Sequence, residues 1–377
     1  MKLEKIKQEF IQFMEEMHAG NPYPRNFYGC LIPIIIEPEP VSQERIMELT
    51  GYSQATISLT IQKIQLLMPV RTIKKIGDRK RYYEYSSPNQ FIIDLMNKRV
   101  NVQDVDIATI ELFRERVFRA YNTNKSYKRF LDYLNNLLLY LNLIHELRTK
   151  NANQLEQIIE RRELGELNLQ GSGVLEQAPL AEFIDKMRAS SKEYATLPRT
   201  NLAESAEYRS LKTEFFSTVK SNFNPLYSQV LVNQFNVIHS VIIEGRTTQE
   251  EIEQSTLLPR STVSETLSSA VNRGIIRIIR NKGSRIKYYE PAILFPDLML
   301  SYFDRTANYI ATMNQRLSSF IKDIRNMRLK SETASKFLNF LLTLEEGYRL
   351  SYAFSINMKV EMLSRLREEF EKGFQFI

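Results

Sequence analysis

Long stretches of the chain carry apolar residues at three- and four-residue spacing, the pattern of amphipathic helices. The first stretch runs from about residue 3 to 18 and ends before the Gly/Pro cluster at residues 20–24. A second apolar helix is expected at residues 26–36. Ser42 is expected to cap a short helix without a full capping box, and Ser53 to cap a longer one. The pattern therefore predicts a mainly α-helical protein.

After these helices the pattern changes from helical to alternating. Residues 70–76 alternate in the manner of a strand, Gly77 and Asp78 mark a turn, and residues 79–85 are expected to form the return strand. Helices joined by a turn and followed by a basic hairpin have the order of a winged helix-turn-helix. The first half of the chain is therefore expected to contain one such module.

The same order returns in the second half, 206 residues later. Between positions 42 and 84, fourteen of forty-three residues are identical at this offset, without a gap. The sharpest match pairs residues 77–84 (GDRKRYYE) with residues 283–290 (GSRIKYYE). An internal repeat of this kind indicates one structural unit present twice. The second copy is expected to hold helices that begin at Thr248 and at residues 259–261, and strands at residues 275–280 and 285–290.

An apolar stripe with helical spacing follows each hairpin and predicts a long helical arm. The stripes comprise Phe130, Leu134, Leu137, Leu141 and Ile144 in the first half, and Phe337, Leu341, Leu344 and Tyr348 in the second. Three glycines and a proline gather between residues 165 and 180, which we assign as a linker. We therefore expect a first module with helical arms at residues 1–164 and a second at residues 181–377.

Positive charge is concentrated on the two expected hairpins. The 377-residue chain has a net charge of +7. Residues 71–81 hold six basic residues and one acidic residue, and residues 273–287 hold six basic residues and no acidic one. This concentration fits contact with phosphates, because each neutralised phosphate releases counterions. The alternative is a pair of solvated basic hairpins without a ligand.

The two expected recognition helices differ on their outward faces. In the first copy Ile57, Ile61 and Ile64 point to the core, and in the second copy Val263, Leu267, Ala270 and Val271 do so. In the first copy the outward residues Gln54 and Gln62 carry amides that suit adenine. Leu59 is suited to contact a thymine methyl, and the alternative is an isolated surface leucine without such a role. Glu265 takes the place of Leu59 in the second copy and is suited to accept from cytosine. We expect the copies to read different bases, or the second to contribute mainly through its hairpin.

The candidate DNA-contacting residues come from both recognition helices and both hairpins. They are Gln54, Thr56, Leu59, Gln62, Lys63, Arg71, Lys74, Lys75, Arg79, Lys80, Arg81, Arg260, Ser261, Thr262, Glu265, Arg277, Arg280, Lys282, Arg285 and Lys287. In each hairpin two adjacent tyrosines, Tyr82–Tyr83 and Tyr288–Tyr289, point to opposite faces, so one of each pair is expected to pack beneath the hairpin.

Four segments of the first half carry a resemblance to a known family: residues 27–29 (FYG), 37–40 (EPEP), 56–58 (TIS) and 77–84. The stretch that contains them resembles GbsR-type regulators, a branch of the MarR-like winged-helix proteins. The second half departs further from that pattern, because at the common offset Gly29 becomes Phe235 and Asp78 becomes Ser284.

The resemblance implies a mainly α fold in which two winged helix-turn-helix modules are joined by long helical arms in a pseudo-two-fold, dimer-like arrangement. The chain would then be a covalently fused dimer. Some relatives sense small molecules such as choline. Four tyrosines at helical spacing are candidates for an aromatic cage or, as we favour, for packing: Tyr121, Tyr127, Tyr133 and Tyr140.

The leading expectation is a transcription regulator that binds double-stranded DNA as a single-chain pseudo-dimer, on an imperfectly palindromic or asymmetric site. Two alternatives stay open. One is an architectural or chromatin-type DNA-binding protein with little sequence specificity. The other is a winged-helix protein-interaction module of transcription or replication machinery. Further homodimerisation and the identity of any small-molecule effector are also open.

Other function classes find no support in the sequence. It contains no Gly-rich phosphate loop, no metal-ligand spacing and no nucleophile motif, so we expect no enzyme, no cofactor and no metal. The three histidines lie in helices with apolar patterning and are expected to be structural. One cysteine and no apolar segment long enough for a bilayer indicate a cytoplasmic protein without membrane contact.

Overall fold

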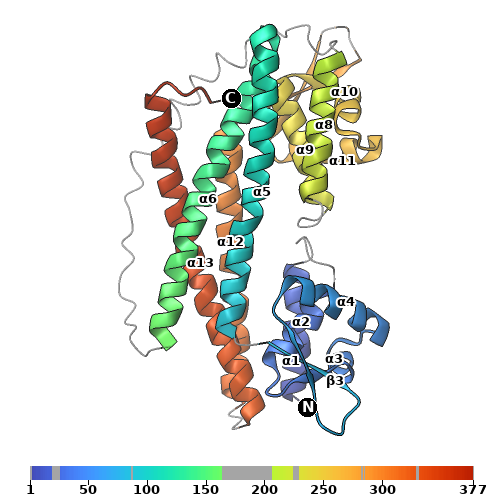
Figure 1. The fold of residues 1–377 in the computed structure, drawn as a ribbon, viewed down its shortest axis with the longest axis vertical. Helices are drawn as coiled ribbons and strands as arrows, with labels where there is room; N and C mark the ends of the chain where they lie inside the picture. Colours follow the sequence, from blue (N-terminus) through green and yellow to red (C-terminus); the bar gives the residue numbers. More distant parts are fainter. Residues whose placement is uncertain are drawn as a thin grey trace. The chain divides into compact units, whose positions relative to one another are not determined.

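The computed structural model describes residues 2–18, 26–85, 88–163, 206–223, 229–281, 283, 285–327 and 331–376. Within these residues the protein is mainly helical and contains two small, three-stranded antiparallel sheets (Figure 1). The chain divides into two compact units. Unit 1 is drawn from Met1–Arg99, Asn151–Leu169 and Thr306–Ser355, and unit 2 from Val100–Lys150, Gln170–Arg305 and Ile356–Ile377.

The first copy of the repeat has the expected order of elements. They are α1 (Lys2–Met17), α2 (Phe27–Ile36), β1 (Val41–Ser42), α3 (Gln43–Thr50), α4 (Gln54–Leu67), β2 (Arg71–Lys74) and β3 (Arg81–Glu84). Ser42 accepts a hydrogen bond from the Arg45 N–H at 3.3 Å, and Ser53 accepts one from the Thr56 N–H at 3.2 Å, which confirms both predicted caps. Gly51 ends α3 at a φ of 72°, which glycine adopts without steric cost.

The second copy repeats this order. Its elements are α8 (Ala206–Phe223), α9 (Gln229–Glu244), β4 (Thr247–Thr248), α10 (Gln249–Thr256), α11 (Arg260–Asn272), β5 (Ile276–Arg280) and β6 (Lys287–Pro291). Thr248 forms a complete capping box with Glu251 at the start of α10. Leu257 stands where the first copy has Gly51, and it too has a positive φ, 53°.

The two sheets share one register. Thr72 pairs with Tyr83 in the first sheet, and Ile278 pairs with Tyr289 in the second, 206 positions further along in both cases. In each sheet the return strand lies in the middle, between the outgoing strand and a two-residue strand that precedes the helix–turn–helix. The repeat found in the sequence is therefore also a repeat of backbone structure.

Each predicted helical arm is a pair of long helices. The first arm consists of α5 (Pro88–Thr123), a short 3-10 turn η1 (Lys125–Tyr127) and α6 (Lys128–Glu163), and the second of α12 (Phe295–Asn326) and α13 (Glu332–Glu371). The two helices of the first arm are in contact where Arg114 Nε of α5 donates to Asn135 Oδ1 of α6 at 3.0 Å. In the second arm Ser318 of α12 donates to Glu345 of α13.

A buried ion pair marks equivalent positions in the first two helices of each copy. Lys7 Nζ lies 2.7 Å from Glu37 Oε1, and the Lys7 side chain is fully buried. Lys212 pairs with Glu244 in the same way, with both side chains largely buried. The lysines are 205 positions apart and the glutamates 207, so the repeat continues through these helices with a shifted offset.

The shifted offset corrects one sequence match. At an offset of 207, Gly29 corresponds to Asn236 and not to Phe235. A Cβ atom at Gly29 would approach the Tyr52 ring to 2.8 Å, so the close packing of α2 on this ring requires glycine there. Asn236 is fully buried, which shows that the second copy packs differently at the equivalent position.

In unit 1, the first copy shares its core with the second arm. The ring centroid of Phe10 in α1 lies 5.4 Å from that of Phe320 and 5.5 Å from that of Phe337. Phe320 belongs to α12 and Phe337 to α13. The same hydrophobic cluster contains Ile57 and Ile61 of α4. Helix–turn–helix and arm therefore form one core, although they come from opposite halves of the chain.

In unit 2, the second copy shares its core with the first arm. Phe215 of α8, the counterpart of Phe10, lies 5.6 Å from Phe130 and 5.3 Å from Phe113, measured between ring centroids. Tyr133 of α6 is fully buried, and its hydroxyl lies 2.7 Å from His239 Nδ1 of α9. Phe130 is the counterpart of Phe337 at an offset of 207, so the packing is crossed in the same way as in unit 1.

This crossed packing differs from the expected division into residues 1–164 and 181–377. Each half was expected to build a module with its own arms, whereas both units combine a helix–turn–helix from one half with arm helices from the other. The periodicity of an arm shows which face is apolar, and it does not show which helix covers that face. The expected linker at residues 165–180 lies outside the described residues.

Candidate nucleic-acid interface

The outward face of α4 carries the residues that the sequence placed there. Ile57, Ile61 and Ile64 are buried in unit 1, as predicted from their angular position. Gln54, Leu59, Gln62 and Lys63 are exposed, and Thr56 is half-buried beside the capping Ser53. The exposed fraction of Leu59 is 61%. A helix face of mixed polar and apolar residues is thus exposed at the surface of unit 1.

The outward face of α11 is more polar and carries less positive charge. Val263, Leu267 and Ala270 are buried, and Val271 is half-buried, so the predicted core face is confirmed with Val271 at its edge. Arg260, Ser261 and Glu265 are exposed, and Thr262 is half-buried. The divergence between α4 and α11 is therefore a divergence of surface residues, while both helices keep the same pattern of buried residues.

The hairpin of β2 and β3, which we call hairpin 1, carries its cations in solvent. Each of the six predicted basic residues is exposed: Arg71, Lys74, Lys75, Arg79, Lys80 and Arg81. Lys75 Nζ lies 3.0 Å from Glu39, and Lys80 Nζ lies 3.4 Å from Glu44. The other four form no ion pair with any described residue. Exposed pairs of this type contribute little to stability, so their cations can exchange to another anion at low cost.

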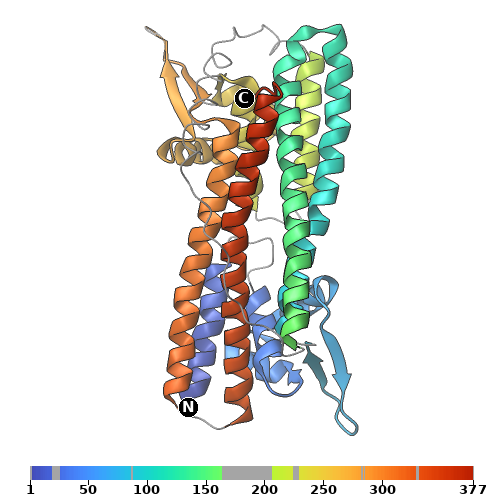
Figure 2. The same cartoon turned by 90° about the vertical axis from the view of Figure 1, so that its left-hand side faces the viewer.

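The hairpin of β5 and β6, hairpin 2, is similar. Arg277 is paired with Glu290 at 3.1 Å, an interaction that Arg246 shares at 2.7 Å. Arg280, Arg285 and Lys287 are exposed and form no ion pair with a described residue. Lys282, another predicted contact residue, lies outside the described residues. Figure 2 shows each hairpin extending away from the helices of its own unit.

The paired tyrosines divide as expected. Tyr83 and Tyr289 are buried, with exposed fractions of 3% and 7%, and they anchor the middle strand of each sheet to the helices. Tyr82 and Tyr288 are half-buried on the opposite face. Each of these rings lies beneath a cation, Lys75 Nζ at 4.6 Å from the Tyr82 centroid and the Arg246 guanidinium at 5.4 Å from that of Tyr288.

Sequence reasoning missed one residue at the tip of hairpin 1. Ile76 has an exposed fraction of 106%, so its side chain is surrounded by solvent. The available signal is a single isoleucine between two lysines and the turn glycine, at the end of the alternating segment that predicts a strand. Asp78 lies in the predicted turn, and its carboxylate accepts hydrogen bonds from the Tyr82 hydroxyl at 2.6 Å and the Lys80 N–H at 2.8 Å.

The predicted packing role of the four arm tyrosines agrees with their burial. Tyr127, Tyr133 and Tyr140 are buried within the core of unit 2, and Tyr121 is packed at its edge. The buried Cys30 has a pKa raised to about 12 by burial and by the nearby Glu15 charge, so its thiol stays protonated. No group of three His, Cys, Asp or Glu side chains in the described residues is placed to hold a metal ion.

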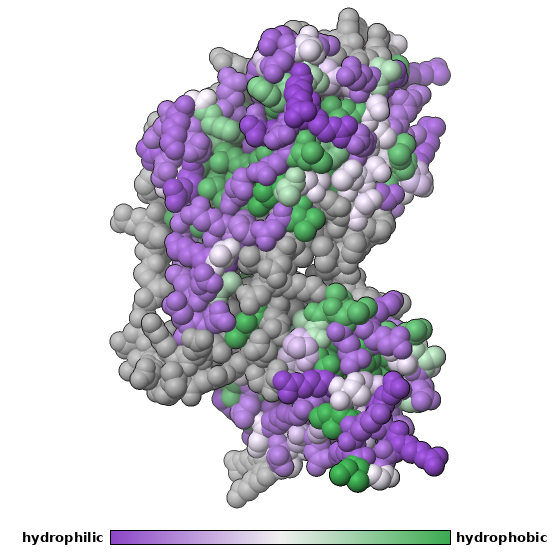
Figure 3. Space-filling model, viewed as in Figure 1, coloured by the Kyte–Doolittle hydropathy of each residue, from purple (hydrophilic) through white to green (hydrophobic). Residues whose placement is uncertain are grey.

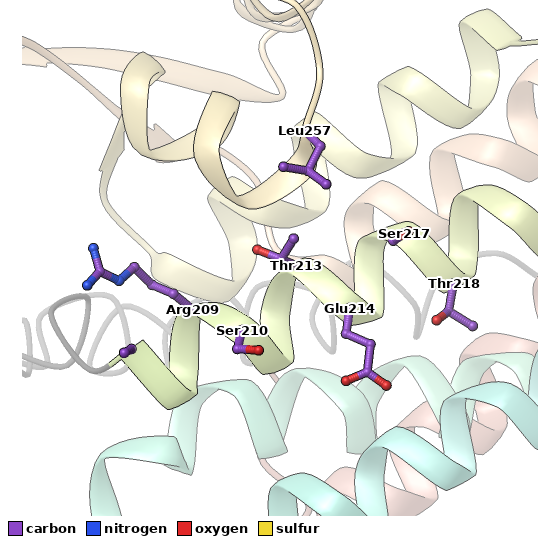
Figure 4. Close-up of a pocket in the computed structure, with 8 residues that line it drawn as sticks. Arg209, Ser210, Thr213, Glu214, Ser217, Thr218 and Leu257 are labelled. Atoms are coloured by element: carbon purple, nitrogen blue, oxygen red, sulfur yellow. The ribbon is translucent and has the colours of Figure 1, made fainter.

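An open hollow of about 680 Å³ lies along α8 in unit 2 (Figure 4). Thr213 and Glu214 of α8 and Leu257 of the α10–α11 turn contribute to its walls. Glu214 is bound there by Arg116 of α5 through two oxygen atoms, one of them 2.7 Å from Arg116 Nη2. None of the predicted contact residues lines this hollow. The surface around α4, α11 and the two hairpins is therefore the candidate interface.

Figure 3 shows hydrophilic and hydrophobic residues interspersed on the side that it presents. Across the described residues we find no helix with the length and apolar character needed to cross a bilayer.

Comparison with known proteins leaves the interface to be interpreted from its own geometry. No model of a known protein family matches the chain, and no curated protein sequence matches it.

Proposed function

We propose that this chain is a transcription regulator that binds double-stranded DNA through two winged helix-turn-helix modules. The observation that carries the proposal is the set of exposed cations on both hairpins that form no ion pair with a described residue. Arg71, Lys74, Arg79 and Arg81 belong to hairpin 1, and Arg280, Arg285 and Lys287 to hairpin 2. Unpaired guanidinium and ammonium groups bind backbone phosphates and release counterions.

The position of the exposed helix faces supports the same proposal. In each copy α4 or α11 follows a turn that contains a residue of positive φ, Gly51 or Leu257, and directly precedes the basic hairpin. Residues on such a face reach base edges in the major groove when the hairpin contacts the flanking backbone. Gln54 and Gln62 offer amides that suit adenine, whereas Glu265 accepts from cytosine.

Crossed packing supports a single-chain pseudo-dimer. The first helix of each copy packs on the arm of the other copy, Phe10 on Phe337 and Phe215 on Phe130. Arms exchanged between two equal chains would build a symmetric homodimer, and the present chain contains both partners. Because Leu59, Gln62 and Lys63 are replaced by Glu265, Ser268 and Ser269, the site it reads is expected to be asymmetric or imperfectly palindromic.

The experiment is selection of binding sites from a random DNA library with the full chain, followed by affinity measurements over a salt series. The proposal expects an enriched asymmetric or imperfect site whose preference over random DNA persists as salt rises. A perfect palindrome would contradict the asymmetry. Equal affinity for selected and random DNA would instead favour the architectural alternative, in which only the backbone is bound.

A second candidate function, protein interaction, is favoured by one observation on α4. Leu59 and Leu66 lie seven positions apart on the same exposed face, with exposed fractions of 61% and 85%. Such leucines suit the apolar groove of a partner protein. Substitution of both by serine separates the candidates, since loss of DNA selectivity supports base contact, and unchanged DNA binding supports a protein partner.

A further inference from the structure

The tip of hairpin 1 exposes one apolar side chain between basic residues. Ile76 is fully exposed, while Lys74 and Arg79 on either side are exposed and form no ion pair with a described residue. An exposed isoleucine side chain costs free energy in proportion to the apolar area that it leaves in contact with water. A solvated basic loop has no need of it, and a polar residue at this position would serve solubility better.

The turn that carries Ile76 is held by its own hydrogen bonds. The Asp78 N–H donates to the Lys75 carbonyl at 3.1 Å, and the Asp78 carboxylate accepts from the Lys80 N–H and the Tyr82 hydroxyl. Gly77 adopts a φ of 80°, which directs the chain back at the residue after Ile76. Preorganisation of this kind lowers the conformational entropy lost when the tip binds.

We propose that Ile76 is a wedge that enters the minor groove of bound DNA, separates two stacked base pairs and bends the duplex. This inference rests on the proposed DNA-binding function. The minor groove is about 6 Å wide, too narrow for a two-stranded ribbon but wide enough for one side chain at its tip. Isoleucine is among the residues that architectural proteins insert between base steps, and the flanking cations neutralise the phosphates on both sides.

A duplex fits this tip better than a lipid surface does. Membrane binding by an apolar segment grows with the apolar area that enters the bilayer, and one isoleucine supplies little area. Insertion into DNA, in contrast, needs only one apolar side chain between two neighbouring base pairs. The tip also belongs to the same module as α4, whose exposed amides and Lys63 suit a nucleic acid.

Hairpin 2 lacks the wedge. Lys282 stands at the position of Ile76, and Ser284 at that of Asp78, so an ammonium group replaces the apolar side chain and the organising carboxylate is missing. The proposal therefore assigns bending to one end of the DNA site only. The two copies would differ in how they deform DNA as well as in the bases that they read.

The test measures the bend of a duplex carrying the selected site, labelled at its two ends for energy transfer, and the fluorescence of 2-aminopurine placed along the flank. The variants are Ile76→Ser, Ile76→Leu and Ile76→Lys in the full chain. The matched control is Ile286→Ser, which removes an exposed isoleucine from hairpin 2.

The wild type, Ile76→Leu and Ile286→Ser are expected to bend the duplex by about 20–90° toward the major groove and to raise 2-aminopurine fluorescence at one step. Ile76→Ser is expected to bind with the same salt slope, without the bend and with roughly tenfold lower affinity. Ile76→Lys is expected to lose the bend and, because it adds a cation, to steepen the salt slope. A straight duplex in the wild-type complex, or an unchanged bend with Ile76→Ser, overturns the wedge while DNA binding itself stands.

Absence of DNA binding by the wild type overturns the proposed function and the wedge together. A parallel measurement uses vesicles that contain phosphatidylserine. Binding to these vesicles that is lost with Ile76→Ser, while the DNA bend is unchanged, assigns the tip to a lipid surface and overturns the wedge.

Discussion

Gly51 and Leu257 occupy the same position in the two helix–turn–helix turns, and both have a positive φ, 72° and 53°. Glycine adopts this conformation without strain, whereas the Cβ of leucine costs about 1–2 kcal/mol there. The Leu257 side chain is 64% exposed and recovers little of that cost by packing. The second copy thus holds a strained turn that the first copy avoids.

Leu257→Gly is therefore expected to stabilise unit 2 by about 0.5–1 kcal/mol, since the strain relieved exceeds the entropy that glycine adds to the unfolded chain. Leu257→Ala keeps a Cβ atom and is expected to give no gain, which makes it the matched control. Gly51→Ala is expected to destabilise unit 1 by about 1 kcal/mol. Urea unfolding followed by circular dichroism measures all three, and equal stabilities of Leu257→Gly and Leu257→Ala would contradict the assignment of strain.

Two buried groups in unit 2 are expected to give opposite pH dependences of stability. Burial lowers the pKa of His239 to about 3 from its usual 6.5. Between these pH values His239 binds a proton in the unfolded chain but not in the folded chain. The contribution of His239 to the free energy of unfolding therefore falls as pH falls below 6.5. Burial raises the pKa of Asp106 to about 7 from 3.8, against the opposing charge of Arg148. Between pH 3.8 and 7 the folded chain holds a proton on Asp106 that the unfolded chain releases. The contribution of Asp106 to the free energy of unfolding therefore falls as pH rises through this range.

Relative to the wild type, Asp106→Asn is expected to gain free energy of unfolding as pH rises from about 4 to 7. The reason is that the variant lacks the buried carboxyl group whose proton makes the wild type less stable as pH rises. His239→Gln is expected to lose it relative to the wild type as pH rises over the same range. The full slope for one group is about 1.4 kcal/mol per pH unit. Denaturant titrations at several pH values measure the differences, and parallel curves for the two variants would contradict the protonation states assigned here.

The crossed cores predict how the chain behaves when it is cut between residues 164 and 205, outside the described residues. Each half would retain an arm whose apolar face is covered, in the intact protein, by the other half. The halves produced together are expected to form a complex with the helical content of the intact chain. Each half produced alone is expected to self-associate or aggregate, because its arm and its helix–turn–helix lack their partners. Two stable, helical monomers would contradict the crossed packing.

Much of the fold was predictable because it is encoded locally. Ser42, Ser53 and Thr248 act as helix caps, and the repeated hairpins keep one register, which follows from hydrogen bonding and from alternation within a few residues. The buried faces of α4 and α11 followed from angular position alone. These features need no knowledge of the rest of the chain.

What the sequence did not yield depends on distant partners. The apolar stripe that contains Phe130 predicts a covered face, but only the structure identifies Phe215 as a residue that covers it. The matching pairs Lys7–Glu37 and Lys212–Glu244 were hidden because their offsets shift in opposite directions around 206. For the candidate interface, composition gave the total charge of the hairpins, whereas the division into paired and unpaired cations required side-chain positions.

Contact between the hairpins and DNA phosphates is tested by the salt dependence of DNA affinity in hairpin variants. Arg79→Ala with Arg81→Ala, and separately Arg285→Ala with Lys287→Ala, remove two cations each from hairpin 1 and hairpin 2. The control, Lys322→Ala with Arg325→Ala, removes two exposed cations from α12. If the hairpins make this contact, each hairpin pair weakens binding and reduces the slope of log affinity against log salt by about 2, while the control changes neither. Unchanged affinity and slope in both hairpin variants would contradict it.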